Sequence, residues 1–208
     1  MAKLRTSIPK QTREAVLREF NHRCALCGAD RPHLHHIDQN PSNSDAANLI
    51  PLCATCHLTD QHDASNAVPE GKLRFFRVHK HRLILRPQFN SVWRRMEFLW
   101  SVSDAESGRA LEERAEELAS LVSHLSMGPF FAERVMRLLR APSTGRMLVV
   151  GDPVSEARYD AEVREDERNY RDQLRRARPE VEALIVELLD HQTWTPAHAK
   201  PVRVKHSD

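Results

Sequence analysis

The sequence predicts an α+β protein, with a small cysteine-containing module followed by a mainly helical region. Two observations lead to this prediction. All four cysteines lie in two C-x-x-C pairs, which enclose a segment of short strand-like and turn-rich stretches. From about Ala105 onward, apolar residues instead recur with the period of an α-helix. We therefore expect a first module over residues 1–68, a connecting segment over 69–104 and a helical region over 105–208.

The composition is that of an ordinary soluble protein, because hydrophobic residues make up 40% and charged residues 29% of the 208 residues. The sequence contains no run of eighteen apolar residues, which a membrane-spanning helix would need. The first residues, MAKLRTSIPK, lack the apolar stretch of a signal peptide. We therefore expect a cytoplasmic location and no membrane partner.

The first module is expected to contain a helix, a strand, a loop, a second strand and a second helix, in that order. Residues 10–22 predict the first helix, because their apolar residues form one stripe and Pro9 lies near the first turn. The following stretch, CALCGADRPHLHHID, predicts a knuckle with a tight turn at Gly28 and then a short strand. QNPSNSDAAN is rich in turn residues and predicts a loop. NLIPLCATCHLTDQHD predicts the second strand, the second knuckle and the start of a helix.

The helical region is expected to begin with two amphipathic helices, LEERAEELASLVSHL and PFFAERVMRLLR. GRMLVVGDP is either a short strand or a buried loop. EARYDAEVREDERNYRDQLRRAR is polar nearly all round, which is typical of a solvated helix or of one bound to a partner. We expect Pro179 to end that helix, VEALIVELLD to form a short apolar helix, and the residues from Thr193 to form a loose tail.

The four cysteines predict a structural zinc site. Cys24 and Cys27 form the first pair, Cys53 and Cys56 form the second, and 25 residues separate the pairs. Zinc favours four soft ligands in a tetrahedron, and each knuckle can supply two thiolates. Two redox pairs or free cysteines are the alternative, but a redox C-x-x-C usually occurs singly beside a βαβ pattern. Four thiolates leave no open coordination position, so we expect this zinc to stabilise the module rather than to catalyse.

Histidines and an asparagine lie between and directly behind the knuckles. His35 and His36 lie in LHHI, Asn48 follows twelve residues after His36, and His57 follows Cys56 directly. Any one of these residues alone is more often an ordinary polar or turn residue. An ideal strand points adjacent side chains to opposite faces, so His35 and His36 reach one site only if the strand ends or twists there. His33 is either an outer ligand or a surface residue, and we favour the surface residue.

The segments CALC, LHHI, NLIPLC and ATCH together resemble the HNH nuclease family, over about 50 residues. The resemblance implies a ββα-metal fold and metal-dependent hydrolysis of DNA phosphodiester bonds. It implies that His36 is the general base, that Asn48 holds the loop and orients the base, and that His35 and His57 bind a catalytic divalent metal. Mg²⁺ or Mn²⁺ is expected with a phosphate substrate, and Ni²⁺ or Zn²⁺ also suits imidazole ligands.

The charge is distributed unevenly along the chain. Residues 1–100 hold 15 Lys and Arg against 9 Asp and Glu, whereas residues 101–208 hold 16 against 20. A basic half favours a polyanionic partner such as DNA, and an acidic, helical half favours a protein partner or a second copy. Residues 72–95 contain eight cations, no carboxylate and interleaved aromatics, which we expect to belong to the core. The candidate DNA-binding residues are Lys72, Arg74, Arg77, Lys80, Arg82 and Arg86.

Two functions remain open from the sequence. The first is a DNA endonuclease, and by family analogy it would be the effector subunit of a bacterial defence system, held by a partner through residues 105–190. The alternative is a non-catalytic zinc ribbon that binds nucleic acid or protein. The histidines separate the two functions, because a binding ribbon needs the four cysteines but not His36, Asn48 and His57 at these spacings.

Overall fold

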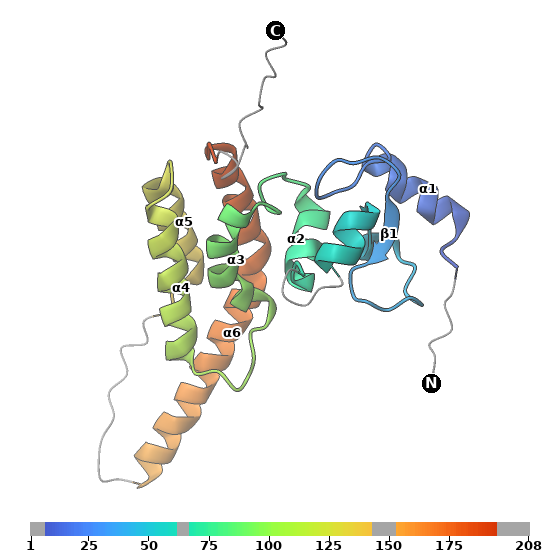
Figure 1. Cartoon of the computed structure of the whole chain (residues 1–208). Coiled ribbons are helices and arrows are strands. Elements are labelled where there is room, and N and C mark those ends of the chain that lie inside the picture. Colours follow the sequence, from blue (N-terminus) through green and yellow to red (C-terminus); the bar gives the residue numbers. More distant parts are fainter. Residues whose placement is uncertain (1–6, 62–66, 143–152, 195–208) are drawn as a thin grey trace.

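The computed structural model describes residues 7–61, 67–142 and 153–194, and it is an α+β structure. Helix α1 (Lys10–Glu19) and a two-stranded sheet lie at one end of the molecule (Figure 1). A bundle that contains α3 to α6 lies at the other end, and α2 (Glu70–His79) lies between them (Figure 1). Within the described residues, no helix combines the length and the apolar character that a membrane span requires.

The sheet pairs β1 (His33–His36) with β2 (Leu49–Leu52) in antiparallel register, so that His35 lies opposite Ile50. All four residues of β2 are buried, whereas β1 has one fully buried side chain, that of His35. The short helix η1 (Ala46–Asn48) leads directly into β2, and the π-helical turn η2 (Cys56–Gln61) follows the second knuckle. This order of elements matches the order that the sequence predicts.

The remaining elements are helical. They are η3 (Pro87–Phe89), α3 (Asn90–Met96), η4 (Glu97–Trp100), α4 (Gly108–Ser123), α5 (Gly128–Leu139) and α6 (Pro153–Asp190). The expected strand or loop at residues 145–153 and the expected tail lie almost entirely outside the described residues.

The prediction that Pro179 ends a helix was wrong, because α6 continues through it to Asp190. Apolar side chains on both sides of the proline are buried: Tyr170, Leu174 and Ala177 before it, and Val181, Ile185 and Leu188 after it. The burial of one continuous face outweighs the cost of a proline inside a helix, which is about 3 kcal/mol. The second half of α6 is therefore not solvated all round, because one of its faces packs into the core.

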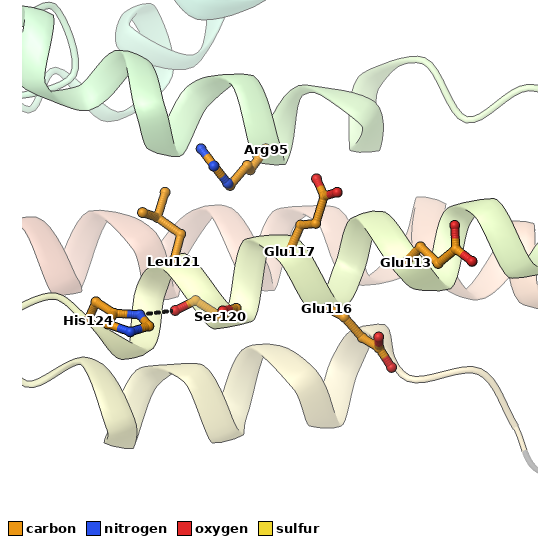
Figure 2. Close-up of a pocket in the computed structure, with 7 residues that line it drawn as sticks. All are labelled: Arg95, Glu113, Glu116, Glu117, Ser120, Leu121 and His124. Carbon is orange, nitrogen blue, oxygen red and sulfur yellow. Dashed lines mark hydrogen bonds between the residues drawn. The ribbon is translucent and has the colours of Figure 1, made fainter.

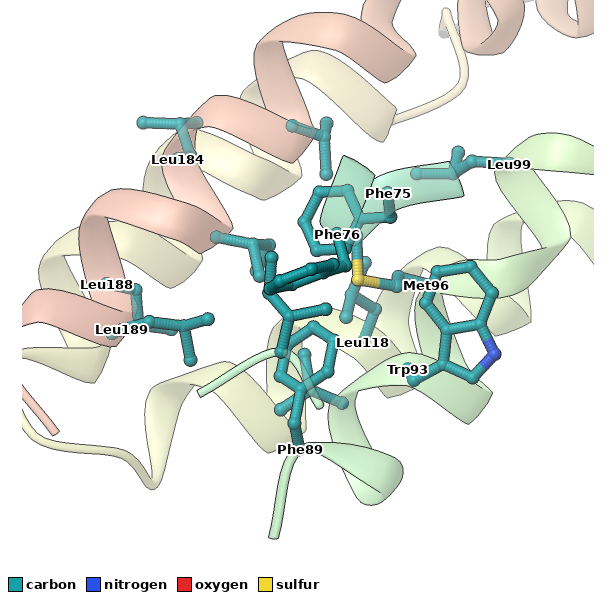
Figure 3. Close-up of a cluster of buried hydrophobic side chains, with 14 of the residues drawn as sticks. Phe75, Phe76, Phe89, Trp93, Met96, Leu99, Leu118, Leu184, Leu188 and Leu189 are labelled. Carbon is teal, nitrogen blue, oxygen red and sulfur yellow. The ribbon is translucent and has the colours of Figure 1, made fainter. Parts of the chain in front are cut away.

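The hydrophobic core continues across all three predicted segments. Its members extend from Cys24 in the first knuckle to Leu189 in α6. The interleaved aromatics of the basic window are buried, as the sequence predicts: Phe75, Phe76, Phe89 and Trp93. They gather in one cluster that faces Leu184, Leu188 and Leu189 of α6 (Figure 3).

Two histidine–carboxylate pairs tie the region around the end of α2 to α6. His79 Nε2 lies 3.1 Å from a carboxylate oxygen of Glu182, and His81 Nε2 lies 3.0 Å from one of Asp190. Together with the shared core, these contacts make the helical region an internal support for the rest of the chain.

Candidate metal centre and histidine cavity

The four cysteines meet at one point of the first module. Each pair of their Sγ atoms lies within 4.8 Å. Cys24 and Cys27 belong to the knuckle before β1, and Cys53 and Cys56 follow β2 directly. Three of the four cysteines are buried, so the cluster is closed on most sides. Cys27 is the exposed member. The paired spacing in the sequence thus corresponds to a four-thiol cluster that could hold a structural metal such as zinc.

The sulfur separations fit a metal better than a disulfide. Cys27 Sγ lies 3.6 Å from Cys53 Sγ, whereas a disulfide bond is about 2.05 Å long. Four thiolates at about 2.3 Å from a zinc ion lie roughly 3.8 Å apart along the edges of the tetrahedron. The observed separation is close to that edge.

The thiols of the second knuckle differ in their readiness to ionise. The backbone N–H of Cys56 donates to Cys53 Sγ and contributes most to lowering the pKa of Cys53 to about 7. Burial raises the pKa of Cys56. A cation at the centre of the cluster would favour the thiolate form at every position, because thiolates are the ligands of zinc.

Four histidines of the first module, His33, His35, His36 and His57, line one cavity of about 750 Å³. His35 and His36 both reach it, although they are adjacent in β1. The strand ends at His36, and a turn follows in which the Gln39 N–H donates to the His36 carbonyl. The termination of the strand therefore lets two adjacent side chains share one site. His57, directly after Cys56, lines the same cavity.

The rings of His35 and His57 are close neighbours. Their centroids lie 5.1 Å apart with an edge-to-face angle of 74°. His35 is buried, and His57 is half-buried. Within the described part of the chain, Nε2 of His36 is buried and has no hydrogen-bond partner. Buried polar atoms are normally satisfied, so this ring nitrogen lacks the partner that a buried histidine nitrogen usually has.

Asn48 is buried and holds the loop between the strands. Its amide group donates to Asp38 Oδ1 at 2.9 Å and to the Asn43 carbonyl at 3.0 Å, and its Oδ1 accepts the Asp38 N–H. Burial raises the pKa of Asp38, but hydrogen bonds from the Asn40 backbone and from the Asn48 and Asn43 side chains outweigh it. The net effect lowers this pKa to about 2. Asn48 thus fixes the chain two residues after His36.

The same loop contains a series of hydrogen bonds from a side-chain oxygen to a backbone N–H two residues later. The acceptors are Asp38, Asn40, Asn43 and Asp45, and the donors are the N–H groups of Asn40, Ser42, Asp45 and Ala47. Such Asx turns let a loop satisfy its own backbone without outside contacts.

The cavity also contains two residues that sequence reasoning missed, Arg13 of α1 and Gln39. His33, which the sequence offered as an outer ligand or a surface residue, is exposed and lines the cavity too. The spacing of His33 from His35 places both on one strand face, which is a signal for His33 in the sequence. Gln39 has a positive φ of 55°, a conformation that is uncommon for residues with a side chain. No sequence pattern connects Arg13 to the histidines, because α1 meets β2 and η1 only in the folded chain.

The six candidate DNA-binding residues occupy different environments. Lys72 is only 3% exposed, and its Nζ donates to Asn90 Oδ1 at 2.6 Å. Its ammonium therefore does not lie on the cationic surface where the sequence places it. Arg74 forms an exposed pair with Glu70. Arg82 and Arg86 are exposed, and within the described residues no ion pair joins either of them to a carboxylate.

Arg77 and Lys80 share a carboxylate with α1. Arg77 donates two hydrogen bonds to Glu19, at 2.8 and 2.6 Å, and further ones to the carbonyls of Leu49 and Ala46. Lys80 also pairs with Glu19. The hydrogen bond from Arg77 contributes most to lowering the pKa of Glu19 to about 2, and Lys80 lowers it further. Arg77 joins α1, η1, β2 and α2, so its environment is that of a structural residue.

Compared with known proteins, the chain matches no family model, no curated protein and no solved structure.

Proposed function

We propose that the chain is a metal-dependent endonuclease of the HNH type, which hydrolyses DNA phosphodiester bonds and carries a structural zinc ion on its four cysteines. One observation carries the proposal: His35, His36 and His57 line a single cavity. A zinc ribbon that only binds nucleic acid needs the cysteine cluster, but it needs no cavity of clustered histidines beside it.

In this proposal the zinc site positions the cavity. The two knuckles lie before β1 and after β2, so a bound ion joins both ends of the hairpin. His57 follows the ligand Cys56 directly, and the zinc therefore fixes where its imidazole lies relative to β1. Loss of the cysteine cluster would disturb the cavity as well as the fold.

The histidines have separate roles. His35 and His57 present two imidazoles whose ring centroids lie 5.1 Å apart, and these two side chains would hold the divalent metal. That ion, when bound, supplies positive charge to the phosphate and to the departing 3′ oxygen. His36 accepts the proton of the attacking water, since an imidazole is a base near pH 7. Asn48 keeps the chain beyond His36 in place through its bonds to Asp38 and Asn43.

The test is cleavage of supercoiled plasmid by the purified full chain, with Mg²⁺, Mn²⁺, Ni²⁺ and Zn²⁺ added in separate reactions. We expect nicked or linear product with at least one metal. His36→Ala should lower the cleavage rate by about 10²- to 10⁴-fold, the usual contribution of a general base, with an unchanged zinc content. His124→Ala is the matched control, because His124 is exposed at the C-terminal end of α4 and lies outside the cavity.

Other outcomes decide between the alternatives. Binding of DNA without cleavage under every metal would favour the non-catalytic zinc ribbon. Cleavage by His36→Ala at the wild-type rate would exclude His36 as the base.

A further inference from the structure

The histidine cavity presents positive charge and no negative charge. Its lining contains one guanidinium and four imidazoles, and the described lining residues include no carboxylate. A second hollow of similar size, about 730 Å³, lies between α3 and α4 and has the opposite character. Its lining contains three carboxylates, those of Glu113, Glu116 and Glu117, and also Arg95 (Figure 2). An anion would be attracted to the first site and repelled by the glutamates of the second.

The guanidinium of the histidine cavity belongs to Arg13, in the first half of α1. The carboxylates of α1 are engaged elsewhere, since Glu14 pairs with Arg18 and Glu19 pairs with Arg77 and Lys80. Within the described residues, no ion pair joins Arg13 to a carboxylate, and its side chain is exposed. Arg13 is therefore a cation that borders the cavity without being neutralised by its own protein.

We propose that Arg13 binds a phosphate group of the nucleic-acid substrate in the histidine cavity. This inference rests on the proposed nuclease function and adds a binding residue from α1 to a site that is otherwise built from β1 and the second knuckle. A guanidinium can hold two phosphate oxygens at once through parallel N–H bonds, which fixes orientation as well as position. Arg13 would thereby orient the phosphodiester toward His35, His36 and His57.

The surface over which DNA approaches is then expected at α1 and β1 rather than at the cations of α2. Among the cations of α2 and the turn after it, Lys72 is buried, and Arg77 and Lys80 share Glu19. Arg13 and His33 instead border the cavity itself. The nucleic acid is therefore expected to lie over α1 and β1, with Arg82 and Arg86 outside the immediate contact.

The experiment measures the equilibrium binding of a fluorescently labelled DNA duplex to the full, zinc-loaded chain without added catalytic metal. Arg13→Ala should weaken binding roughly 10- to 100-fold, as expected for the loss of a charge-assisted hydrogen bond. The slope of log Kd against log salt concentration should become shallower by about 0.9, because one fewer phosphate is neutralised. Arg13→Lys should keep the slope and lose less affinity, since it retains the charge but not the fork.

Arg18→Ala is the matched control, because Arg18 lies on the same helix and is already paired with Glu14. It should leave both the affinity and the slope unchanged. If Arg18→Ala loses as much DNA affinity as Arg13→Ala, the loss reflects the change in net charge alone, and the proposal is overturned. If Arg13→Ala binds with wild-type affinity and slope while the wild type still cuts plasmid, the Arg13 site is wrong and the nuclease stands. If the wild type neither binds nor cuts DNA, both proposals fail. The zinc content of each variant reports whether the module has folded.

Discussion

Lys72 shows how the environment of a single residue can oppose what its charge suggests. Its side chain is buried beside Phe89, with the ammonium 5.7 Å from the centre of that ring. Burial lowers the pKa of Lys72 to about 8. The folded state therefore prefers the neutral amine more strongly than the unfolded chain does, since an unfolded lysine has a pKa of about 10.4.

Lys72→Met should make this preference measurable. The unfolded state binds more protons between about pH 8 and pH 10.4, so the stability of the wild type rises with pH across that range. Methionine does not titrate, and the stability of the variant relative to the wild type should therefore fall by about 2 kcal/mol between pH 7 and pH 10. Urea unfolding of both proteins at the two pH values checks this result. A difference in stability that is the same at both values would contradict it.

His57→Ala tests the proposed metal ligand. The variant should lose cleavage activity, because it lacks one of the two imidazoles that we propose as ligands of the divalent metal. Raising the concentration of Mg²⁺ or Mn²⁺ should restore part of the activity, since a weakened site fills at higher concentration. Cleavage by the wild type in the presence of a chelator that leaves the structural zinc in place would refute a role for a second metal.

At this scale, what the sequence could predict depends on whether a residue's neighbours in the chain determine its environment. The four cysteines could be predicted to meet, because two short turns and one hairpin suffice to bring them together. Lys72 and Arg77 could not be placed, since the sequence reveals their charge but not the packing of α2 against the rest of the chain. Arg13 was missed for the same reason.

Among the elements, the junction of α4 and α5 has a strict steric requirement. Met127 takes a positive φ of 61°, and α5 begins at Gly128. A Cβ atom at Gly128 would lie 2.2 Å from the Val122 carbonyl oxygen, a backbone atom that cannot move independently. The two helices can therefore approach this closely only because residue 128 has no side chain.

Gly128→Ala should destabilise the protein by roughly 2 kcal/mol or more, because the helices must separate to admit a methyl group. Gly108→Ala is the matched control at the start of α4, where a Cβ would lie 3.4 Å or more from the flexible side chain of Glu167. That variant should be neutral or more stable than the wild type, since alanine favours the helix. Thermal unfolding of both variants and the wild type measures these differences. If Gly128→Ala is as stable as Gly108→Ala, the junction of α4 and α5 relaxes to accept the methyl group.

The elements themselves were the most predictable part of the fold. Amphipathic periods indicated α4 and α5, and the strands β1 and β2 were expected beside the two knuckles, on either side of the turn-rich loop. Pro179 was misleading because local propensity predicts a break, whereas tertiary burial on both sides of the residue keeps α6 continuous. The sequence around Pro179 contains no local signal of that burial.

For the molecule as a whole, the cysteine cluster and the helical bundle are stabilised by different interactions. The first module has short elements that add few residues to the shared core and brings four thiols together, whereas α4, α5 and α6 pack on one another through buried leucines, valines and Phe131. Removal of the metal with a strong chelator, or Cys53→Ser, should therefore unfold the first module but leave most of the helical circular dichroism. Complete loss of that signal would show that the bundle cannot fold without the module.

Glu19 joins α1 to α2, and its contribution to the free energy of unfolding should depend on pH. The hydrogen bond from Arg77 lowers the pKa of Glu19 to about 2, so the stabilisation is present above the unfolded value and is lost as the pH falls from about 4.3 to about 2. Glu19→Gln should cost about 1–2 kcal/mol at pH 7, after allowance for solvent screening of a partly exposed group. This cost should shrink as the pH is lowered. Both proteins share the pH dependence of metal binding, so their difference isolates the ion pair, and a cost independent of pH would contradict the assignment.

The Asx turns between β1 and β2 have a consequence for the order of events during folding. Each of these bonds joins positions two residues apart, so the loop can take its shape at little cost in chain entropy. Contacts between residues so close in the sequence form early in folding, and hairpins close within roughly 1–10 μs. The two knuckles would then be near each other before any ion arrives. Metal capture would finish the module rather than start it, and its rate should follow zinc concentration without a slow search by the chain.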